Sequence, residues 1–73
     1  MAPLTHAQYE VLERAVVDGS RVAIRRRGRR EHIVIPRRLG LKNGREIIEA
    51  INSTTGHALE IDVDEIEHLE VVR

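Results

Sequence analysis

With 73 residues, the chain is long enough for one hydrophobic core but not for two, so we expect a single domain over residues 1–73. The absence of cysteine excludes a disulfide framework and thiolate metal ligands. The N-terminal segment lacks the apolar run of a signal peptide, and no stretch approaches the roughly 18 apolar residues of a membrane span. Together these features predict a cytoplasmic protein that has no membrane partner.

The formal net charge is zero, but the charged residues are unevenly distributed along the chain. Residues 1–38 contain nine arginines and four acidic residues, a net charge of +5. Residues 39–73 contain three basic and eight acidic residues, a net charge of −5. This asymmetry predicts a basic face and an acidic face, and the basic face is a candidate for phosphate contact. Because Tyr9 is the only aromatic residue, base stacking on aromatic rings is largely excluded.

A helix is predicted from Thr5 to about Asp18. Thr5 and Gln8 have the spacing of a capping box, in which each side chain bonds the backbone N–H of the other residue. Gly19 favours the left-handed conformation that often ends a helix. The predicted apolar stripe, which includes a hydrophobic staple at its start, consists of Leu4, Tyr9, Leu12, Ala15 and Val16.

From Ser20 the apolar residues recur with a period of two, which predicts β-strands. In the first strand, Val22 and Ile24 alternate with Arg21, Ala23 and Arg25, and Gly28 then turns the chain. The second strand is predicted from Arg30 to Ile35, with Ile33 and Ile35 on one face and His32 and Val34 on the other. Pro36 should stop this strand or bend it at an edge, and Leu39 to Gly44 should form a loop.

The second half of the chain predicts three further strands. Asn43-Gly44 is a strong turn signal before a third strand from Arg45 to Ile51. Asn52 to Gly56 forms the next hairpin loop, and a fourth strand contains Leu59, Ile61 and Val63. A tight turn at Asp64-Glu65-Ile66 precedes a fifth strand with Leu69 and Val71. Because the connections are short, we expect consecutive strands to pair antiparallel.

Five short strands with one apolar face can bury that face only if the sheet curls and the helix covers an open end. The predicted fold class is therefore α+β, an N-terminal helix followed by a five-stranded antiparallel SH3-like or Sm-like barrel.

Four segments of this sequence resemble the WYL-type domain, a bacterial Sm-like fold usually attached to transcription regulators. They are Gly19-Ser20-Arg21-Val22-Ala23-Ile24, Val34-Ile35-Pro36-Arg37-Arg38-Leu39, Gly44-Arg45-Glu46-Ile47-Ile48-Glu49-Ala50 and Asp64-Glu65-Ile66, within a match from about Val11 to Val72. The resemblance implies a transcription-regulatory binding module. At the motif that names the family, Trp-Tyr-Leu is replaced by Glu46-Ile47-Ile48, so the family's ligand pocket is not implied.

Two further resemblances leave alternatives open. The segments 9–15 and 59–66 are similar to the Rho-binding antiterminators, another Sm-like family, whose acidic members cover an RNA-binding surface on their partner. That resemblance implies the same barrel but a protein partner. Residues 33–44 resemble the swapped-hairpin DNA-binding proteins of the AbrB type, although Pro36 and Leu39 are too close for the helical turn of those proteins.

The main candidate for function is the stretch from residue 21 to residue 38, which contains eight arginines and one glutamate. Guanidinium groups are planar and permanently charged, and neutralising several phosphates gives a salt-dependent affinity. Arg14 and Arg73, outside this stretch, serve as controls. The alternative is a solvated strand face that is partly paired with the acidic half of the chain. The predicted nucleic-acid-binding residues, for contact with DNA or RNA phosphates, are Arg21, Arg25, Arg27, Arg29, Arg30, Arg37 and Arg38.

The competing function is a protein-interaction module that binds a protein partner, or a second copy as a homo-oligomer, through strand edges or complementary charge. The four histidines lack zinc-ligand spacing, and the acidic residues after Leu59 do not follow a calcium-loop pattern. The hydroxyl side chains fall at a helix cap and in turns, where backbone bonding explains them. We therefore expect no enzymatic activity, no bound metal and no cofactor.

Overall fold

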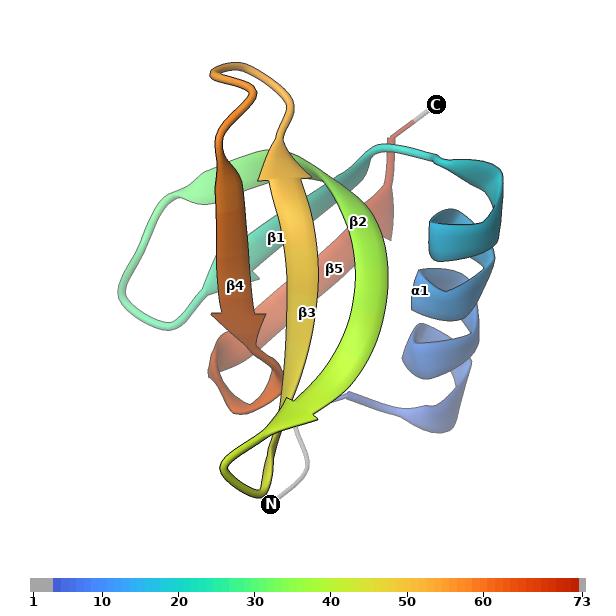
Figure 1. The fold of residues 1–73 in the computed structure, drawn as a ribbon, viewed down its shortest axis with the longest axis vertical. Helices are drawn as coiled ribbons and strands as arrows, with labels where there is room; N and C mark the ends of the chain where they lie inside the picture. Colours follow the sequence, from blue (N-terminus) through green and yellow to red (C-terminus); the bar gives the residue numbers. More distant parts are fainter. Residues whose placement is uncertain (1–3, 73) are drawn as a thin grey trace.

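The structure is a computed structural model that describes residues 4–72 (Figure 1). It confirms the α+β class, with one N-terminal helix followed by a five-stranded antiparallel sheet. Arg73, the second control arginine, lies outside the described residues. The elements in chain order are α1 (His6–Asp18), β1 (Val22–Arg26), β2 (Glu31–Lys42), β3 (Arg45–Asn52), β4 (Ala58–Asp62), the 3₁₀ helix η1 (Val63–Glu65) and β5 (Ile66–Val71).

Helix α1 begins and ends where the sequence predicts. The Thr5 hydroxyl accepts a hydrogen bond from the Gln8 N–H, and the Gln8 side chain accepts one from the Thr5 N–H, which completes the capping box. Gly19 ends the helix with φ of 69°. Leu12 and Ala15 are fully buried against the sheet, so the predicted stripe is the docking face of the helix.

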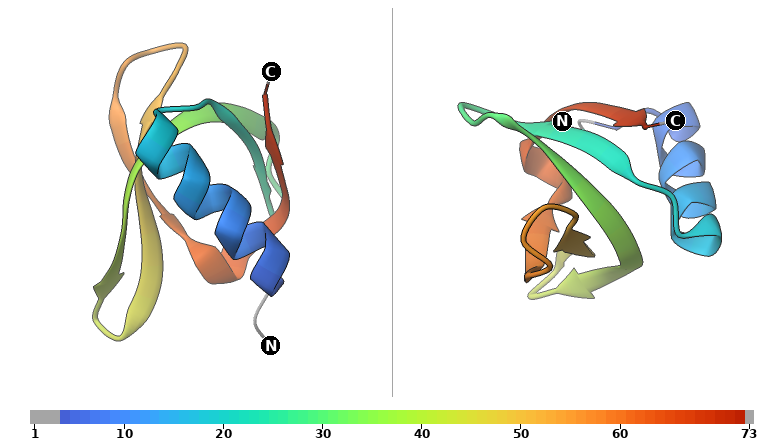
Figure 2. Two further views of the ribbon diagram at one scale, coloured as in Figure 1. Left: turned by 90° about the vertical axis from the view of Figure 1, so that its right-hand side faces the viewer. Right: turned by 90° about the horizontal axis from the view of Figure 1, so that it is seen from above.

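The strand order in the sheet is β4-β3-β2-β1-β5, and all neighbouring strands are antiparallel. Consecutive strands pair from β1 to β4 as expected, but β5 pairs with β1 and not with β4. The tight corner at η1 separates β4 from β5, and β5 then places Leu69 opposite Ile24 in the core. The sheet is strongly curved (Figure 2). It does not close into a complete barrel, because β4 and β5 do not pair.

The hydrophobic core lies between α1 and the concave side of the curved sheet, and every strand contributes to it. No charged or polar residue among residues 4–72 is fully buried. With almost no aromatic residues available, aliphatic side chains fill the interior. The core residues are Leu4, Leu12, Ala15, Val22, Ile24, Val34, Ile48, Ala50, Ile61, Val63, Ile66 and Leu69.

The prediction that Leu39 to Gly44 forms a loop is wrong. Strand β2 continues through Pro36 to Lys42, and only Asn43 and Gly44 form the turn, with φ of 53° and 78°. Proline is tolerated here because β1 pairs with β2 only as far as Val34. Beyond that point no strand on the β1 side needs a hydrogen bond from the N–H that proline lacks. The register with β3 shifts just after Pro36, so the residue bends the strand and does not stop it.

Candidate functional site

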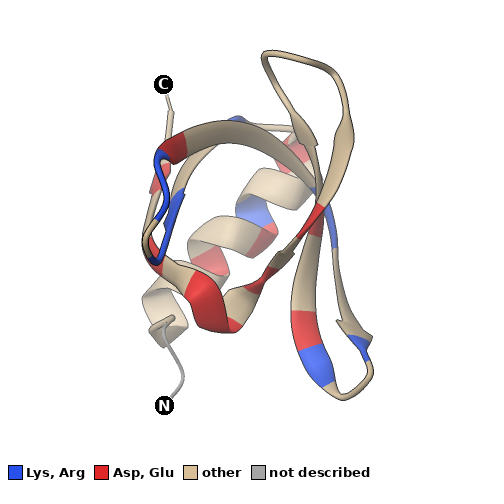
Figure 3. Ribbon diagram, turned by 90° about the vertical axis from the view of Figure 1, so that its left-hand side faces the viewer, with Lys and Arg blue, Asp and Glu red and all other residues tan. Residues whose placement is uncertain are grey.

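The β1–β2 hairpin places a group of arginines at one end of the sheet. Arg25 lies opposite Glu31 in the last pair of the two strands, and the Arg29 N–H donates to the Arg26 carbonyl to close the turn. Gly28 has φ of 71°, a conformation that other residues rarely adopt, so this turn is specified by the sequence. We call residues 25–30 the arginine turn; in Figure 3 its ribbon is basic on both sides of the glycine at its tip.

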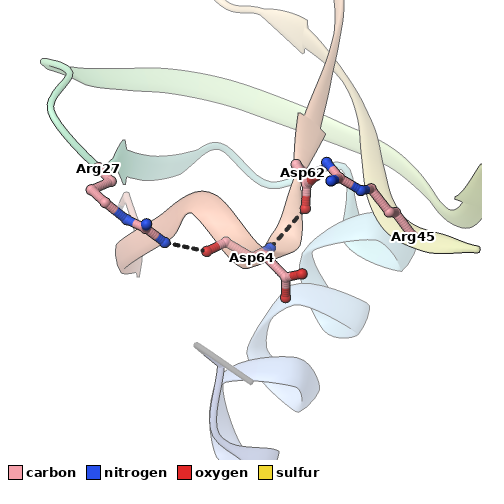
Figure 4. A network of polar contacts seen from close by, with 4 residues as sticks. All are labelled: Arg27, Arg45, Asp62 and Asp64. Atoms are coloured by element: carbon pink, nitrogen blue, oxygen red, sulfur yellow. Dashed lines mark hydrogen bonds and ion pairs between the residues drawn. The ribbon is translucent and has the colours of Figure 1, made fainter. Parts of the chain in front are cut away.

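The arginine turn is anchored to η1 by backbone and side-chain contacts. The Arg27 N–H donates to the Glu65 carbonyl at 2.8 Å, and the Arg27 guanidinium donates to the Asp64 carbonyl at 3.1 Å (Figure 4). The Asp62 carboxylate in turn accepts from the Asp64 N–H and from Arg45 of β3, both at 2.9 Å. One polar network therefore connects the arginine turn, η1 and β3.

The seven predicted arginines differ in whether the chain neutralises them. Arg25 pairs with Glu67 at 3.7 Å, and Arg38 pairs with Glu49 at 3.1 Å. The Arg27 guanidinium bonds the Asp64 carbonyl and makes no ion pair within residues 4–72. Within residues 4–72 the other four make no ion pair, and all four are exposed; they are Arg21, Arg29, Arg30 and Arg37.

The structure brings four of the seven together and separates the other three. Arg25, Arg27, Arg29 and Arg30 belong to the arginine turn, whereas Arg21 precedes β1 at its opposite end. Arg37 and Arg38 lie on β2 beyond its last pair with β1, where only β3 runs alongside. As phosphate contacts, these three remain a prediction from the sequence.

Sequence reasoning left Arg26 out of the candidate set, because strict alternation turns it away from Arg25 and Arg27. The register between β1 and β5 shifts between Arg25 and Arg26, and Arg26 is only half-buried and has no ion pair within residues 4–72. A β-bulge of this kind has no local sequence signal beyond the approach to Gly28. Arg26 therefore joins the arginine turn as a further basic group.

A second feature is an open groove of about 590 Å³ over the β3–β4 ladder, next to the bend in β2. Its apolar lining comes from Ala50, Ile51, Ala58 and Leu59. Charged side chains also line it, and they are Arg37, Glu49 and Glu60.

The described residues contain neither a metal-binding cluster nor a membrane-spanning helix. Among residues 4–72, no three His, Cys, Asp or Glu side chains gather in a way that could hold a metal ion. In the same part of the chain, the one α-helix is too short and too polar to cross a membrane.

Comparison with known proteins gives a structural match without a sequence match. No family model matches the sequence, and no curated protein matches it significantly. Among solved structures, the chain is similar to proteasome accessory factor B/C (PafBC) of Arthrobacter aurescens, with a TM-score of 0.77 and 21% sequence identity. The match covers 93% of this chain but only 12% of the PafBC chain. This likeness shows a shared fold, which in PafBC is a small part of a much longer protein.

Proposed function

We propose that this chain is a regulatory binding module of the WYL type, and that it contacts nucleic-acid phosphates through the arginine turn. One observation carries the proposal: Arg29 and Arg30 are exposed and make no ion pair within residues 4–72, on a turn that is held in place by the contacts of Arg27. A basic group that is both fixed and unneutralised is available to an external anion.

The chemistry of the arginine turn favours phosphate as that anion. Arginine presents a planar set of donors that matches phosphate oxygens, and release of counterions from the nucleic acid adds to the affinity. The turn contains no aromatic side chain for base stacking. The apolar face of α1 packs on the core, so this face is not free to contact bases. We therefore expect contacts mainly to the backbone of DNA or RNA and little dependence on sequence.

Two further findings support the module. The resemblance to WYL-type domains in segments such as Val34–Leu39 agrees with a helix followed by a curved five-stranded sheet. The match to part of PafBC fits a unit that works within larger proteins or assemblies. The proposal contains no catalytic step, since the Thr5, Ser53 and Thr55 hydroxyls bond backbone groups at a cap and in a turn.

Fluorescence anisotropy with labelled single- and double-stranded DNA and RNA tests the proposal. At low salt, Arg29→Glu and Arg30→Glu together should weaken binding by about tenfold or more, because two favourable phosphate contacts become repulsive. Replacing either arginine with alanine should lower the slope of log affinity against log salt by about one unit.

Arg14→Glu is the control, because it reverses the charge of one exposed arginine on α1, outside the arginine turn. It should leave the affinity nearly unchanged. If the doubly reversed variant has the circular dichroism spectrum of the parent and still binds nucleic acid as the parent does, the arginine turn is a solvated surface and the protein-interaction function takes its place.

A further inference from the structure

The turn between β2 and β3, on a different hairpin from the arginine turn, leaves two reactive groups side by side. Asn43 and Gly44 form this two-residue turn, both with positive φ, and both residues are exposed. Within residues 4–72, the Asn43 side chain takes part in no hydrogen bond, and the Gly44 N–H donates to no acceptor. The side-chain amide and the backbone nitrogen that follows it are therefore not held by any other group of the described chain.

Glycine at position 44 also leaves its nitrogen sterically open. A side chain at this position would crowd the nitrogen, and glycine has none. Apart from its two chain neighbours, no heavy atom lies within 4 Å of the point where a Cβ of Gly44 would stand. The Gly44 nitrogen can therefore approach Cγ of Asn43, with which it closes a five-membered ring.

Asn52, the other asparagine of the chain, provides an internal comparison. Its Oδ1 accepts hydrogen bonds from the N–H groups of Thr54 and Thr55 at 2.9 and 3.1 Å. The nitrogen that follows it is engaged as well, because the Ser53 N–H donates to the Ile33 carbonyl at 3.0 Å. The structure therefore holds both of the corresponding groups here, unlike those at the β2–β3 turn.

We propose that Asn43 is a modification site, at which loss of ammonia and uptake of water convert the asparagine into aspartate or isoaspartate. The Gly44 nitrogen gives its proton to a solvent base and forms a bond to Cγ of Asn43. The bond from Cγ to the side-chain nitrogen breaks, and this nitrogen leaves as ammonia after taking up a proton from water. Water then opens the resulting succinimide ring at either carbonyl, which gives the two products. The reaction needs no redox partner and no enzyme, so it accumulates with the age of the folded molecule.

The two products change the hairpin in different ways. Aspartate before glycine suits the same turn, so this product adds only a carboxylate between Lys42 and Arg45. Those cations already pair with Glu60 and Asp62, and the new carboxylate competes for them. Isoaspartate carries the backbone through the side-chain carbon and lengthens the two-residue turn by one atom. Because the turn sets the register of β2 with β3, this second product disturbs the pairing of Lys42 with Arg45.

Incubation of the full chain in mildly alkaline buffer, followed by cleavage after glutamate and mass spectrometry of the peptides, tests the proposal. This cleavage places the two asparagines in separate peptides, 32–46 and 50–60. Asn43 should react at least about tenfold faster than Asn52, because reaction at Asn52 must wait until its hydrogen bonds open. In heavy-oxygen water the products at position 43 should contain the heavy isotope, and an isoaspartyl methyltransferase should label the isoaspartate.

The same incubation in urea separates the effect of the fold from the effect of the following residue. The unfolded chain keeps Gly44 after Asn43 and Ser53 after Asn52, so only the hydrogen bonds are lost. Unfolding should therefore increase the rate at Asn52 by a larger factor than the rate at Asn43.

Two variants serve as controls. In Asn43→Gln the longer side chain would have to close a larger ring, so position 43 should stay unmodified while Asn52 reacts as in the parent. Asn43→Asp contains the added charge without the longer backbone. Its amide spectrum should match that of the aspartate product and should differ from that of the isoaspartate product at Lys42 and Arg45.

Two results would overturn the proposal. The first is a rate at Asn43 in the folded chain that is no higher than the rate at Asn52. The second is an increase at Asn43 on unfolding that equals or exceeds the increase at Asn52, because the folded turn would then protect the site. Nucleic-acid binding by the arginine turn is measured separately, so either proposal can fail without the other.

Discussion

The arginine turn and the face shared by β2, β3 and β4 contain the same kinds of charged residue but differ in how the chain treats them. On the β2–β4 face, three of the four basic side chains have an acidic partner on another strand, at 2.9 to 3.1 Å, and Arg37 has none within residues 4–72. In the arginine turn, Arg25 has a carboxylate at 3.7 Å, whereas Arg29 and Arg30 make no ion pair within residues 4–72. A count of charges does not separate these regions, but the pairing does. The three pairs of the β2–β4 face are Arg38–Glu49, Lys42–Glu60 and Arg45–Asp62.

Strand geometry explains this difference. Residues on neighbouring strands face each other at fixed spacing, so Arg38 of β2 meets Glu49 of β3 and Arg45 of β3 meets Asp62 of β4. Lys42 of β2 reaches Glu60 of β4, with β3 between the two strands. A hairpin turn has no strand beyond it, so the side chains of Arg29 and Arg30 have no such neighbour. Exposed ion pairs contribute about 0–1 kcal/mol each to the free energy of unfolding. The main effect of the β2–β4 pairs is therefore that their charges are neutralised within the chain and are less available to an external partner.

Both regions depend on the same core, and the largest expected effect comes from breaking it. Leu12→Ala should lower the free energy of unfolding by about 2–4 kcal/mol, because Leu12 is fully buried and its truncation leaves a cavity. Urea denaturation measures the loss. Val17→Ala, at a helical position that is 82% exposed, is the control and should change little. A loss of only a few tenths of a kcal/mol for Leu12→Ala would mean that α1 is not docked on the sheet.

Asp62 connects the two regions, and its loss should have the next largest effect. Asp62→Ala removes the N-cap of η1 and the partner of Arg45, which should cost about 1–2 kcal/mol. It should also increase hydrogen exchange at the Arg27 N–H, whose acceptor is the Glu65 carbonyl of η1. Unchanged exchange at Arg27 would show that the arginine turn does not depend on this network.

Tyr9 of α1 contacts Glu46 of β3, and its loss should have a smaller effect on stability. Its hydroxyl donates to Glu46 at 2.6 Å, and this hydrogen bond, together with burial and the Glu46 charge, raises the pKa of Tyr9 to about 12. The unfolded chain loses the tyrosine proton near pH 10 and the folded chain does so only near pH 12. The Tyr9 contribution to stability is therefore fully present below pH 10 and is lost as the pH rises to about 12.

Because Tyr9 is the only aromatic residue, its phenolate absorbance reports this titration without interference. In Tyr9→Phe, the part of the stability loss between about pH 10 and pH 12 that comes from ionisation of Tyr9 should be absent. Titration of Tyr9 at the ordinary value for tyrosine in the folded chain would contradict the contact with Glu46.

The smallest expected effect is that of a single ion pair on the β2–β4 face. In a double-mutant cycle, Lys42→Ala and Glu60→Ala should show a coupling free energy of about 0.5 kcal/mol or less, because both side chains are about half exposed. The coupling should shrink further at high salt. A coupling above about 2 kcal/mol would mean that these ion pairs contribute substantially to the stability of the sheet. The β2–β4 face and the arginine turn would then differ in their contribution to stability as well as in whether their charges are free to bind a partner.

Local signals in the sequence predicted most of the fold. The capping box at Thr5, the glycine after Asp18 and the Asn43-Gly44 turn each specify backbone geometry within a few residues, and all three are present. The extension of β2 beyond Pro36 was missed, because the penalty for proline depends on whether a strand runs along its N–H side. The pairing of β5 with β1 was missed as well, since short connections indicate only neighbours along the chain.

The candidate site was predicted in part. The sequence located the arginines, and alternation with the Gly28 turn grouped five of them, of which four lie at one hairpin and Arg21 lies at the opposite end of β1. Which arginines have acidic partners depends on register across strands, such as Arg38 with Glu49, and local patterns do not contain that information. The groove was not foreseen, because it combines the bend of β2 with side chains from β3 and β4.

The pairing of β1 with β5 has a consequence for the order in which the molecule assembles. Hairpins between β1 and β2, β2 and β3, and β3 and β4 join residues that are close along the chain, so their loops close at little entropic cost. The β1–β5 ladder, from Val22–Val71 to Arg26–Ile66, joins opposite ends of the sheet sequence and must form over a long loop. A growing polypeptide therefore exposes the outer edge of β1 until β5 has emerged. The support that η1 gives to the arginine turn forms after the β1–β2 hairpin, so chains that still lack η1 and β5 present this basic hairpin without its anchor.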